Sequence, residues 1–321
     1  DCVYNVIMTD EQDLQEIEEL QAMLREDSSN FQARRRLAVV LLDKGFNEES
    51  LKQFQFLISI FPQDASLYYN KGIVHEKMRD LQKAEQSYLK AIELSPEETD
   101  FYYNLGLVYI DMREFDKAID CFKRVLSTDI DDSNSYFNLG LCYVKKEQPE
   151  IAKVCFMKAV QLNSNDIFAH FHLGYIYKNE GKIPEAIAEY KKVIEQSPNY
   201  SWAYFNLGSI AYDQGDFNSA LGYLQKTLEY NPRDIEAYKI ITKILCKFER
   251  YDEAMMMMKA ALQEITDNGD LYYVMAQILK NKQLWGEYKQ CMELAMQNHE
   301  TLSIQPKEVQ IELEKNLPNN I

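Results

Sequence analysis

Residues 101–109 read FYYNLGLVY, and related stretches lie 34 residues before and after them. Residues 67–75 read LYYNKGIVH, and residues 136–143 read YFNLGLCY. Two small residues recur at the same spacing: glycine at Gly72, Gly106, Gly140, Gly174 and Gly208, and alanine at Ala84, Ala118, Ala152, Ala186, Ala220 and Ala254. Two series in phase over this length indicate an array of stacked repeats rather than a single globular core.

Within each repeat the apolar residues follow the spacing of two helices. In the repeat that begins at residue 99, a first stripe at positions i, i+3, i+4 and i+7 comprises Tyr102, Leu105, Gly106 and Tyr109. A second stripe comprises Ile119, Phe122, Val125 and Leu126. A polar break at residues 113–114 separates the stripes, so the pattern predicts two antiparallel helices joined by a short turn.

The repeats resemble the tetratricopeptide repeat family, whose pattern runs W-x2-L-G-x2-Y, then A-x3-F, then P. The repeat from residue 99 supplies Tyr102, Leu105, Gly106, Tyr109, Ala118 and Phe122, with Ile130 in place of the proline. The repeats from residues 65, 133, 167 and 201 follow the same pattern. The resemblance implies an all-α fold, a right-handed α-solenoid of stacked antiparallel helix pairs.

Three segments are predicted along the chain. Residues 31–302 hold eight repeats, of which those in 65–234 match the family pattern strongly and the others are degenerate. Residues 1–30 form an acidic N-terminal capping helix, and residues 303–321 form a C-terminal capping helix and tail. Caps are expected because each repeat buries its apolar face only against its neighbours.

The composition limits the partners that the chain can bind. Its 51 acidic and 35 basic side chains give a net charge of −16, which repels nucleic acid and anionic lipid. No apolar run approaches the ~18 residues that span a bilayer, so no direct membrane insertion is expected. The six cysteines have no metal-binding spacing and are expected to be reduced thiols in the cytoplasm. A removed N-terminal leader or anchor stays open.

The residues outside the packing stripe of the first helices are expected to line the concave groove that the resemblance implies. One series is aromatic and comprises Tyr69, Tyr103, Phe137, Phe171 and Phe205. The next is mostly asparagine and comprises Asn70, Asn104, Asn138, His172 and Asn206. Asparagine inside a helix costs ~0.6 kcal/mol relative to alanine, so the series needs a compensating role. Either the amides bond between adjacent repeats, or they form a ladder that holds the main chain of an extended peptide.

Two further features concern the ligand. The carboxylate clamp known in the family needs Lys and Arg where this chain has Tyr69, Tyr103 and Phe137, so a chaperone clamp is not expected. Later in the chain, a candidate patch for acidic ligands comprises Lys239, Lys243, Lys247 and Lys280. The first three are four residues apart and share one helix face, and contact with solvent is the usual explanation for lysines at this spacing.

These patterns predict a non-enzymatic scaffold or adaptor that binds an extended or helical peptide from a protein partner. No catalytic motif and no phosphate-binding glycine loop occurs, and we expect neither a cofactor nor a metal. His170 and His172 are two residues apart and cannot chelate one ion from a helix. Two alternatives stay open: a self-associating structural scaffold, and the targeting arm of a larger enzyme or complex.

Overall fold

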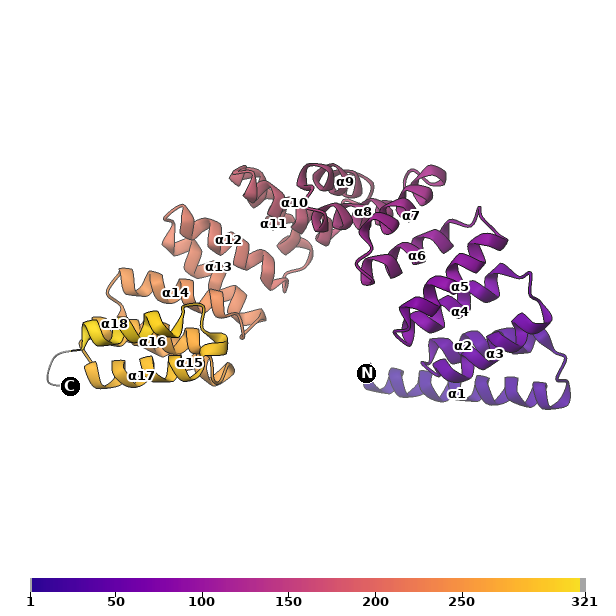
Figure 1. The fold of residues 1–321 in the computed structure, drawn as a ribbon, viewed down its shortest axis with the longest axis horizontal. Helices are drawn as coiled ribbons and strands as arrows, with labels where there is room; N and C mark the ends of the chain where they lie inside the picture. The colour runs from indigo at the N-terminus through magenta and orange to yellow at the C-terminus, as the bar shows by residue number, and fades with distance from the viewer. Residues whose placement is uncertain (1, 318–321) are drawn as a thin grey trace. The chain divides into compact units, whose positions relative to one another are not determined.

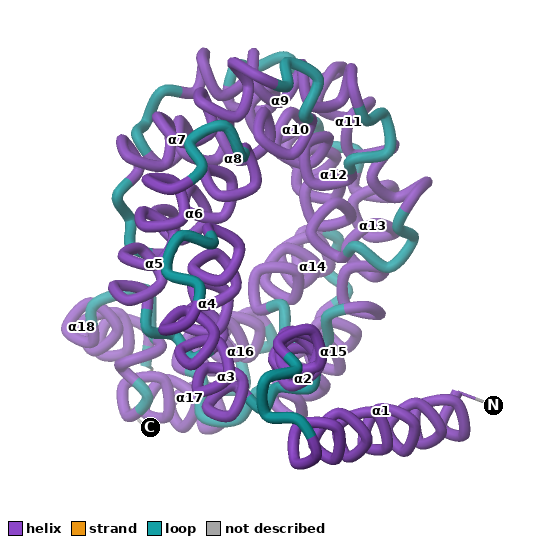
Figure 2. Tube along the Cα trace, turned by 90° about the vertical axis from the view of Figure 1, so that its right-hand side faces the viewer, coloured by secondary structure: helices purple, strands orange, loops and turns teal. Residues whose placement is uncertain are grey.

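The computed structural model describes residues 2–317, and the surroundings of side chains from Leu14 onward. Within these residues the regular elements are eighteen α-helices and one short 3-10 helix, and the tube in Figure 2 contains no strand. The all-α class and the α-solenoid architecture are thereby confirmed. Asp1 and residues 318–321, which belong to the two predicted capping segments, lie outside the described part of the chain.

The chain divides into two compact units, residues 1–169 and 170–321. The first unit contains α1 (Cys2–Glu26), α2 (Phe31–Asp43), α3 (Asn47–Ile60), α4 (Ala65–Lys77), α5 (Leu81–Leu94), α6 (Thr99–Asp111), α7 (Phe115–Thr128), α8 (Ser133–Lys145) and α9 (Pro149–Leu162). The unit boundary falls within α10 (Ile167–Asn179). The second unit contains α11 (Ile183–Gln196), α12 (Ser201–Asp213), α13 (Phe217–Tyr230), α14 (Ile235–Lys247), α15 (Tyr251–Glu264), α16 (Gly269–Asn281), α17 (Trp285–Gln297) and α18 (Pro306–Asn316).

Each predicted repeat forms one pair of neighbouring helices, as Figure 1 shows for α4 with α5 and for α12 with α13. The turn inside the pair has one conformation throughout the array. Its left-handed residue recurs every 34 positions, at Gly45, Arg79, Arg113, Glu147, Gly181, Gly215, Glu249 and Gln283. The polar break at residues 113–114 is therefore the tight turn between the two helices of that repeat.

The recurrent glycines lie where the two helices of a repeat approach most closely. A Cβ atom on Gly106 would lie 2.8 Å from Cζ of Phe122, the aromatic residue of the second helix. Phe122 itself is fully buried. The same contact pairs Gly72 with Tyr88, Gly140 with Phe156, Gly174 with Tyr190 and Gly208 with Leu224. The glycine of the first helix therefore provides the space that the large residue of the second helix fills. This explains why the two residues recur together in each of these repeats.

Additional helices lie beside the first and the last pair. In the first unit, α1 packs Ile17, Leu20 and Leu24 against the apolar side of α2. In the second unit, α18 buries Val309 and Leu313 in a cluster with residues of α16 and α17. Figure 1 shows α16, α17 and α18 close together. In each case apolar surface of a terminal pair is buried by a helix outside the repeats.

A polar group also joins α18 to the last repeat. The carboxylate of Glu312 accepts hydrogen bonds from Tyr273 at 2.7 Å, from Gln277 at 3.1 Å and from Lys280 at 3.2 Å. All three donors lie on α16. Tyr273 stands at the position of the predicted aromatic series, so α18 lies where another repeat would follow.

Candidate functional site

The predicted aromatic series lies on the first helix of each pair and is half-buried. Each ring packs against the buried aromatic of the second helix, with centroid separations of 5.8 Å for Tyr69–Tyr88 and Tyr103–Phe122. Phe137 and Phe171 make the same contact, each at 5.7 Å. Phe205 is also partly buried and packs against the core of the second unit. One side of each ring is thus used for packing inside its repeat.

Two asparagines of the next series bond to the preceding repeat. Asn104 donates its amide to the hydroxyl of Tyr69 at 2.6 Å. Asn138 donates to the hydroxyl of Tyr103 at 3.1 Å and also to the carbonyl of Asn134 at 3.0 Å. The side chain of Asn138 is only 8% exposed. These contacts agree with the packing interpretation of the series, and a role toward a ligand stays a prediction.

The other members of the series have different partners. Asn70 donates to the carbonyl of Ser66 at 2.8 Å, and Asn206 donates to that of Trp202 at 2.9 Å. Each of these bonds stays within one helix turn, and the preceding repeat has no tyrosine at the matching position, which is Phe171 for Asn206. Lys178 of the preceding repeat instead donates to the side-chain oxygen of Asn206 at 3.5 Å. His172 replaces asparagine in this series, and its ring packs edge-on against Phe171.

A cavity of about 420 Å³ opens in the first unit, where the two series meet the connection between α9 and α10. The predicted residues Tyr103, Phe137 and Asn138 line it, together with Leu107 and Asn134 on the same two helices, α6 and α8. The remaining wall comes from Asn163, Asn165, Asp166, Ile167 and Phe168. The cavity therefore combines aromatic surface with several carboxamides.

Phe168 is the most exposed apolar residue of this cavity, with 51% of its surface accessible. Its ring lies 6.4 Å from that of Phe137. Asp166 holds this end of α10 by accepting the backbone N–H groups of Phe168 and Ala169, at 3.1 and 3.0 Å. The loop residues Asn163 and Asn165 were missed by sequence reasoning, because their position depends on the loop conformation rather than on the repeat.

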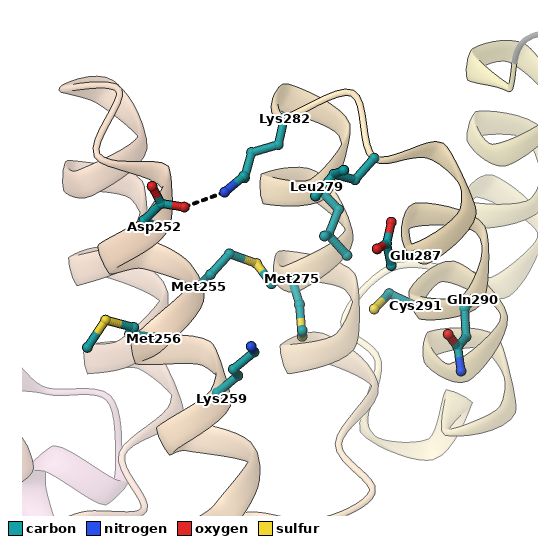
Figure 3. A pocket seen from close by; sticks show the side chains of 11 residues that line it. Asp252, Met255, Met256, Lys259, Met275, Leu279, Lys282, Glu287, Gln290 and Cys291 are labelled. Atoms are coloured by element: carbon teal, nitrogen blue, oxygen red, sulfur yellow. Dashed lines mark hydrogen bonds and ion pairs between the residues drawn. The ribbon is translucent and has the colours of Figure 1, made fainter.

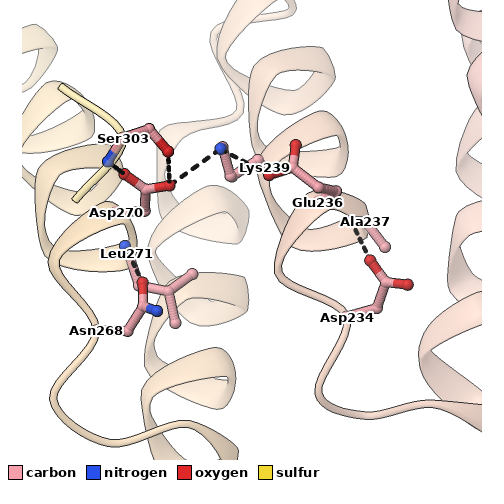
Figure 4. A network of polar contacts seen from close by, with 8 residues as sticks. All are labelled: Asp234, Glu236, Ala237, Lys239, Asn268, Asp270, Leu271 and Ser303. Atoms are coloured by element: carbon pink, nitrogen blue, oxygen red, sulfur yellow. Dashed lines mark hydrogen bonds and ion pairs between the residues drawn. The ribbon is translucent and has the colours of Figure 1, made fainter. Parts of the chain in front are cut away.

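The predicted lysine patch is partly neutralised by the chain itself. Figure 4 shows Lys239 between Glu236 and Asp270, at 2.8 and 3.2 Å. Ser303 also donates its backbone N–H and its hydroxyl to Asp270. Burial acts to raise the pKa of Asp270, but the hydrogen bonds from Ser303 and the charge of Lys239 lower it below its ordinary value. Lys239 therefore anchors α14 to α16.

The other three lysines differ in their surroundings. Lys280 bonds to Glu312 of α18, and the ammonium of Lys247 lies 4.2 Å from the centre of the Phe217 ring. Lys243 is exposed and forms no ion pair with any residue that the structure describes. The structure thus leaves Lys243 as the member of the patch with the least compensated charge. Binding of an acidic ligand there stays a prediction.

A second cavity, of about 520 Å³, lies in the second unit between α15, α16 and α17. Figure 3 shows Met255, Met275 and Leu279 around it, with the ion pair between Asp252 and Lys282 at its upper edge. The four adjacent methionines 255–258 lie on different faces of α15: Met258 is fully buried, whereas Met256 is 70% exposed. The lining carries charges of both signs, which gives no preference for a class of ligand.

No group of three or more His, Cys, Asp or Glu side chains that could hold a metal ion occurs in the part of the chain that the structure describes. Among those residues, none of the helices combines the length and the apolar character needed to cross a bilayer.

Comparison with known families identifies the repeats. Family models described as tetratricopeptide repeats match residues 65–98, 99–132 and 133–166, and also 155–188 and 201–234. A further TPR repeat model matches residues 174–215. Together these matches span residues 65–234, more than half of the chain. The chain belongs to the tetratricopeptide repeat family.

Solved structures agree with this assignment. YrrB, described as a TPR protein with an unusual peptide-binding site, is 31% identical over 57% of this chain and 95% of its own, with a TM-score of 0.50. Residues 41 to the end of MamA from Desulfovibrio magneticus RS-1 are 25% identical over 54% of this chain and 97% of that chain, also with a TM-score of 0.50.

A more distant structure shows the fold alone. The C-terminal part of a TPR repeat-containing protein from Cytophaga hutchinsonii is 17% identical over 74% of this chain and 97% of its own, with a TM-score of 0.63. A search of curated proteins found no match. The family, together with YrrB and MamA, supports a protein-interaction scaffold.

Proposed function

We propose that this chain is a non-enzymatic interaction scaffold that binds an extended peptide segment of a protein partner. The observation that carries the proposal is the cavity between α6, α8 and the start of α10, where Tyr103, Phe137 and Asn138 converge with Phe168. The peptide-binding site named for YrrB, a relative at 31% identity, supports the same class of ligand.

The lining of this cavity suits a peptide with one apolar side chain. Phe137 and Phe168 offer aromatic surface for that side chain, and aromatic anchors of this kind dominate binding energy at protein interfaces. The exposed carboxamides of Asn134 and Asn163 supply donors and acceptors for the peptide main chain. The amide of Asn138 instead holds the cavity wall, because it is committed to Tyr103 and Asn134.

The electrostatic balance favours a basic peptide. The chain has a net charge of −16, which attracts cationic partners and raises their association rate. A peptide with an apolar residue next to Lys or Arg would therefore satisfy both the aromatic wall and the surrounding field.

The proposal can be tested with peptides selected from a displayed random library against the immobilised chain. Affinity of the selected peptides is then measured by fluorescence anisotropy for the wild type and for Phe168→Ser. We expect the substitution to weaken binding by about tenfold or more, as truncation of a central aromatic anchor does. Because Phe168 is largely exposed, the variant should keep its melting temperature.

Trp202→Ser is the matched control. Trp202 occupies the same repeat position 34 residues later, is 56% exposed, and lies outside the cavity. Selected peptides that bind Phe168→Ser as tightly as the wild type would refute this site. Light scattering across a range of concentrations separates the proposal from the self-associating scaffold. The molar mass of a self-associating chain rises with concentration, whereas that of a monomeric peptide receptor stays constant.

We further propose a reducing location such as the cytoplasm. The thiols of Cys121, Cys142, Cys155 and Cys291 are buried and free. Burial raises the pKa of Cys121 and Cys142 to about 12, so these thiols stay protonated and unreactive at neutral pH.

A further inference from the structure

The repeat formed by α4 and α5 differs from the others on the face where its two helices meet. In the repeat of α6 and α7, this face is filled by Leu105, Tyr109 and Cys121, with exposed fractions of 2, 5 and 7%. The equivalent positions, 34 residues earlier, are Lys71, His75 and Ser87. The first two of these positions have thus changed from the residues of the next repeat to a lysine and a histidine, with a serine beside them.

No other repeat shares this change. The position of Lys71 is elsewhere occupied by Leu37, Leu105, Leu139, Leu173, Leu207, Ile241 and Met275. The position of His75 is elsewhere occupied by Leu41, Tyr109, Tyr143, Tyr177, Ala211, Leu245 and Leu279. A polar substitution inside a packing stripe costs free energy unless its polar atoms find partners. Two such substitutions one helical turn apart therefore require a compensating role.

A cavity of about 190 Å³ lies between α4 and α5 and is lined in part by these residues; the two neighbouring helices are shown in Figure 1. Its lining includes three lysines, Lys71, Lys83 and Lys90, and no acidic residue. His75 and Ser87 form its buried side. In a chain of net charge −16, this is a local concentration of positive charge.

His75 has an unsatisfied polar atom. Its side chain is 4% exposed, and its Nδ1 has no hydrogen-bond partner among the described residues. A buried polar atom without a partner costs about 1–3 kcal/mol, so a group that fills the cavity and bonds to the ring would recover this free energy. Burial lowers the pKa of His75, and the charges of Lys71 and Lys83 lower it further while Asp80 opposes them. The ring is therefore neutral at neutral pH and has one N–H to donate.

The lysines are compensated to different degrees. Lys83 pairs with Asp80 at 2.6 Å and Lys90 with Glu93 at 2.8 Å, both on α5 or at its start. Lys71 forms no ion pair with any described residue, and it is partly buried at the side of the cavity. Lys71 is thus the lysine of this cavity whose charge has no acidic partner among the described residues, and an external anion would compensate it.

We propose that the cavity between α4 and α5 binds a single phosphate group, held by Lys71 and His75 with Lys83 and Lys90 beside them. Phosphate oxygens accept several charge-assisted hydrogen bonds at once, which matches a lining that carries three lysines and a buried imidazole. At ~30 Å³ per water, the cavity has room for about six water molecules, enough for one phosphate group with some of its hydration.

The test is a calorimetric titration of the full chain with sodium phosphate, with sodium chloride at equal ionic strength as the blank. The wild type should show saturable binding of phosphate. In Lys71→Leu/His75→Tyr, which restores the residues of the next repeat, we expect binding to weaken by about tenfold or more. Lys145→Leu, which removes one positive charge at the end of α8, should bind like the wild type.

A second measurement does not depend on the double variant folding. Phosphate should shift the ring resonances of His75 in nitrogen-15 spectra of the wild type, whereas chloride should not. A peptide that carries phosphoserine, titrated in parallel, separates the two sources: tighter binding than inorganic phosphate identifies a phosphorylated partner, and equal binding identifies free phosphate. Absence of saturable phosphate binding by the wild type, or equal binding by the folded double variant, would overturn the proposal.

Discussion

The amide of Asn138 donates a hydrogen bond to the hydroxyl of Tyr103, 35 residues earlier in the chain. Asn104 makes the equivalent bond to Tyr69. Each bond joins the first helices of two consecutive repeats, so the asparagine contributes to stacking, and Asn138 bonds to its own helix as well. This role compensates for the helix propensity that asparagine loses relative to alanine.

The energy of this link can be measured with a double-mutant cycle of Asn138→Ala and Tyr103→Phe. We expect each single substitution to lower the free energy of unfolding by about 0.5–1.5 kcal/mol, the usual value of one hydrogen bond. The two effects should be coupled by about 1 kcal/mol, because both remove the same contact. Urea unfolding of the four proteins checks this, and additive effects would show that the bond contributes nothing.

Gly106→Ala should be strongly destabilising for a helical substitution. The new Cβ would lie 2.8 Å from Phe122, a fully buried ring, and overpacking of this kind costs about 1–3 kcal/mol. Gly222→Ala is the control, because Gly222 lies inside α13 and has no atom within 4 Å of a built Cβ. We expect this control to gain up to ~1 kcal/mol from helix propensity. Equal melting temperatures for the two variants would contradict the close contact.

Glu147→Gly should stabilise the first unit. Glu147 has a φ of 58°, a left-handed conformation that costs a non-glycine residue about 1 kcal/mol. Glycine removes this strain but loses more entropy on folding, so we expect a net gain of about 0.5 kcal/mol. The reverse change, Gly181→Ala at φ 75°, should cost about 1 kcal/mol although its Cβ would meet no atom within 4 Å. Thermal unfolding of both variants decides whether backbone strain or side-chain contact controls this turn.

We expect the second unit to lose stability as the pH falls, because the partly buried carboxylate of Glu189 becomes protonated. Burial acts to raise the pKa of Glu189, but hydrogen bonds with His170 and Lys192 lower it below the ordinary value of 4.5. Because the folded-state pKa lies below the unfolded one, ionised Glu189 stabilises the fold above the unfolded-state pKa. This contribution is lost as the pH falls through the folded-state pKa.

The measurement is urea unfolding between neutral pH and about pH 3. Glu189→Gln should flatten the acid limb of the curve, whereas Glu185→Gln, an exposed acid on the same helix, should leave it unchanged. An unaltered slope for Glu189→Gln would show that the buried pair does not control the acid sensitivity.

Glu312→Ala should loosen α18 without unfolding the repeats. The substitution removes three hydrogen bonds to α16, from Tyr273, Gln277 and Lys280. We expect faster amide hydrogen exchange in α18 and the adjoining turns of α16, with little change in α12 and α13. Glu314→Ala, an exposed position on α18, serves as the control. Unchanged exchange in α18 would mean that Val309 and Leu313 alone hold this helix.

Most of the fold could be predicted because its determinants are periodic. Gly106 and Phe122 recur with their repeats, so the pairing of the two helices could be predicted, whereas the contact between these two residues is shown by the structure. The bond between Tyr103 and Asn138 joins two positions that had been noted separately. The sequence does not show that these two side chains meet, because a residue of one repeat lies beside the residue 35 positions later, one more than the repeat length.

Other parts of the site have no periodic signal. Asn163 and Asn165 enter the cavity through a loop between helices, and loop conformation depends on local turns that the repeat does not encode. Lys239 could be placed on a helix face, but its pairing with Asp270 depends on the distance between two repeats. The spacing of the lysines on one helix face therefore indicated a patch for acidic ligands, whereas in the structure Lys239 links α14 to α16.

The helices of this chain pack against their nearest neighbours in sequence, and this has a consequence for folding. Contacts of short sequence separation need little loop closure, which favours rapid folding. We expect the earlier repeats to acquire structure while later ones are still being synthesised, as domains do that fold in order from the N-terminus. Circular dichroism of residues 1–166 alone tests this: a helical signal that melts cooperatively is the expected result, and a random-coil spectrum would contradict it.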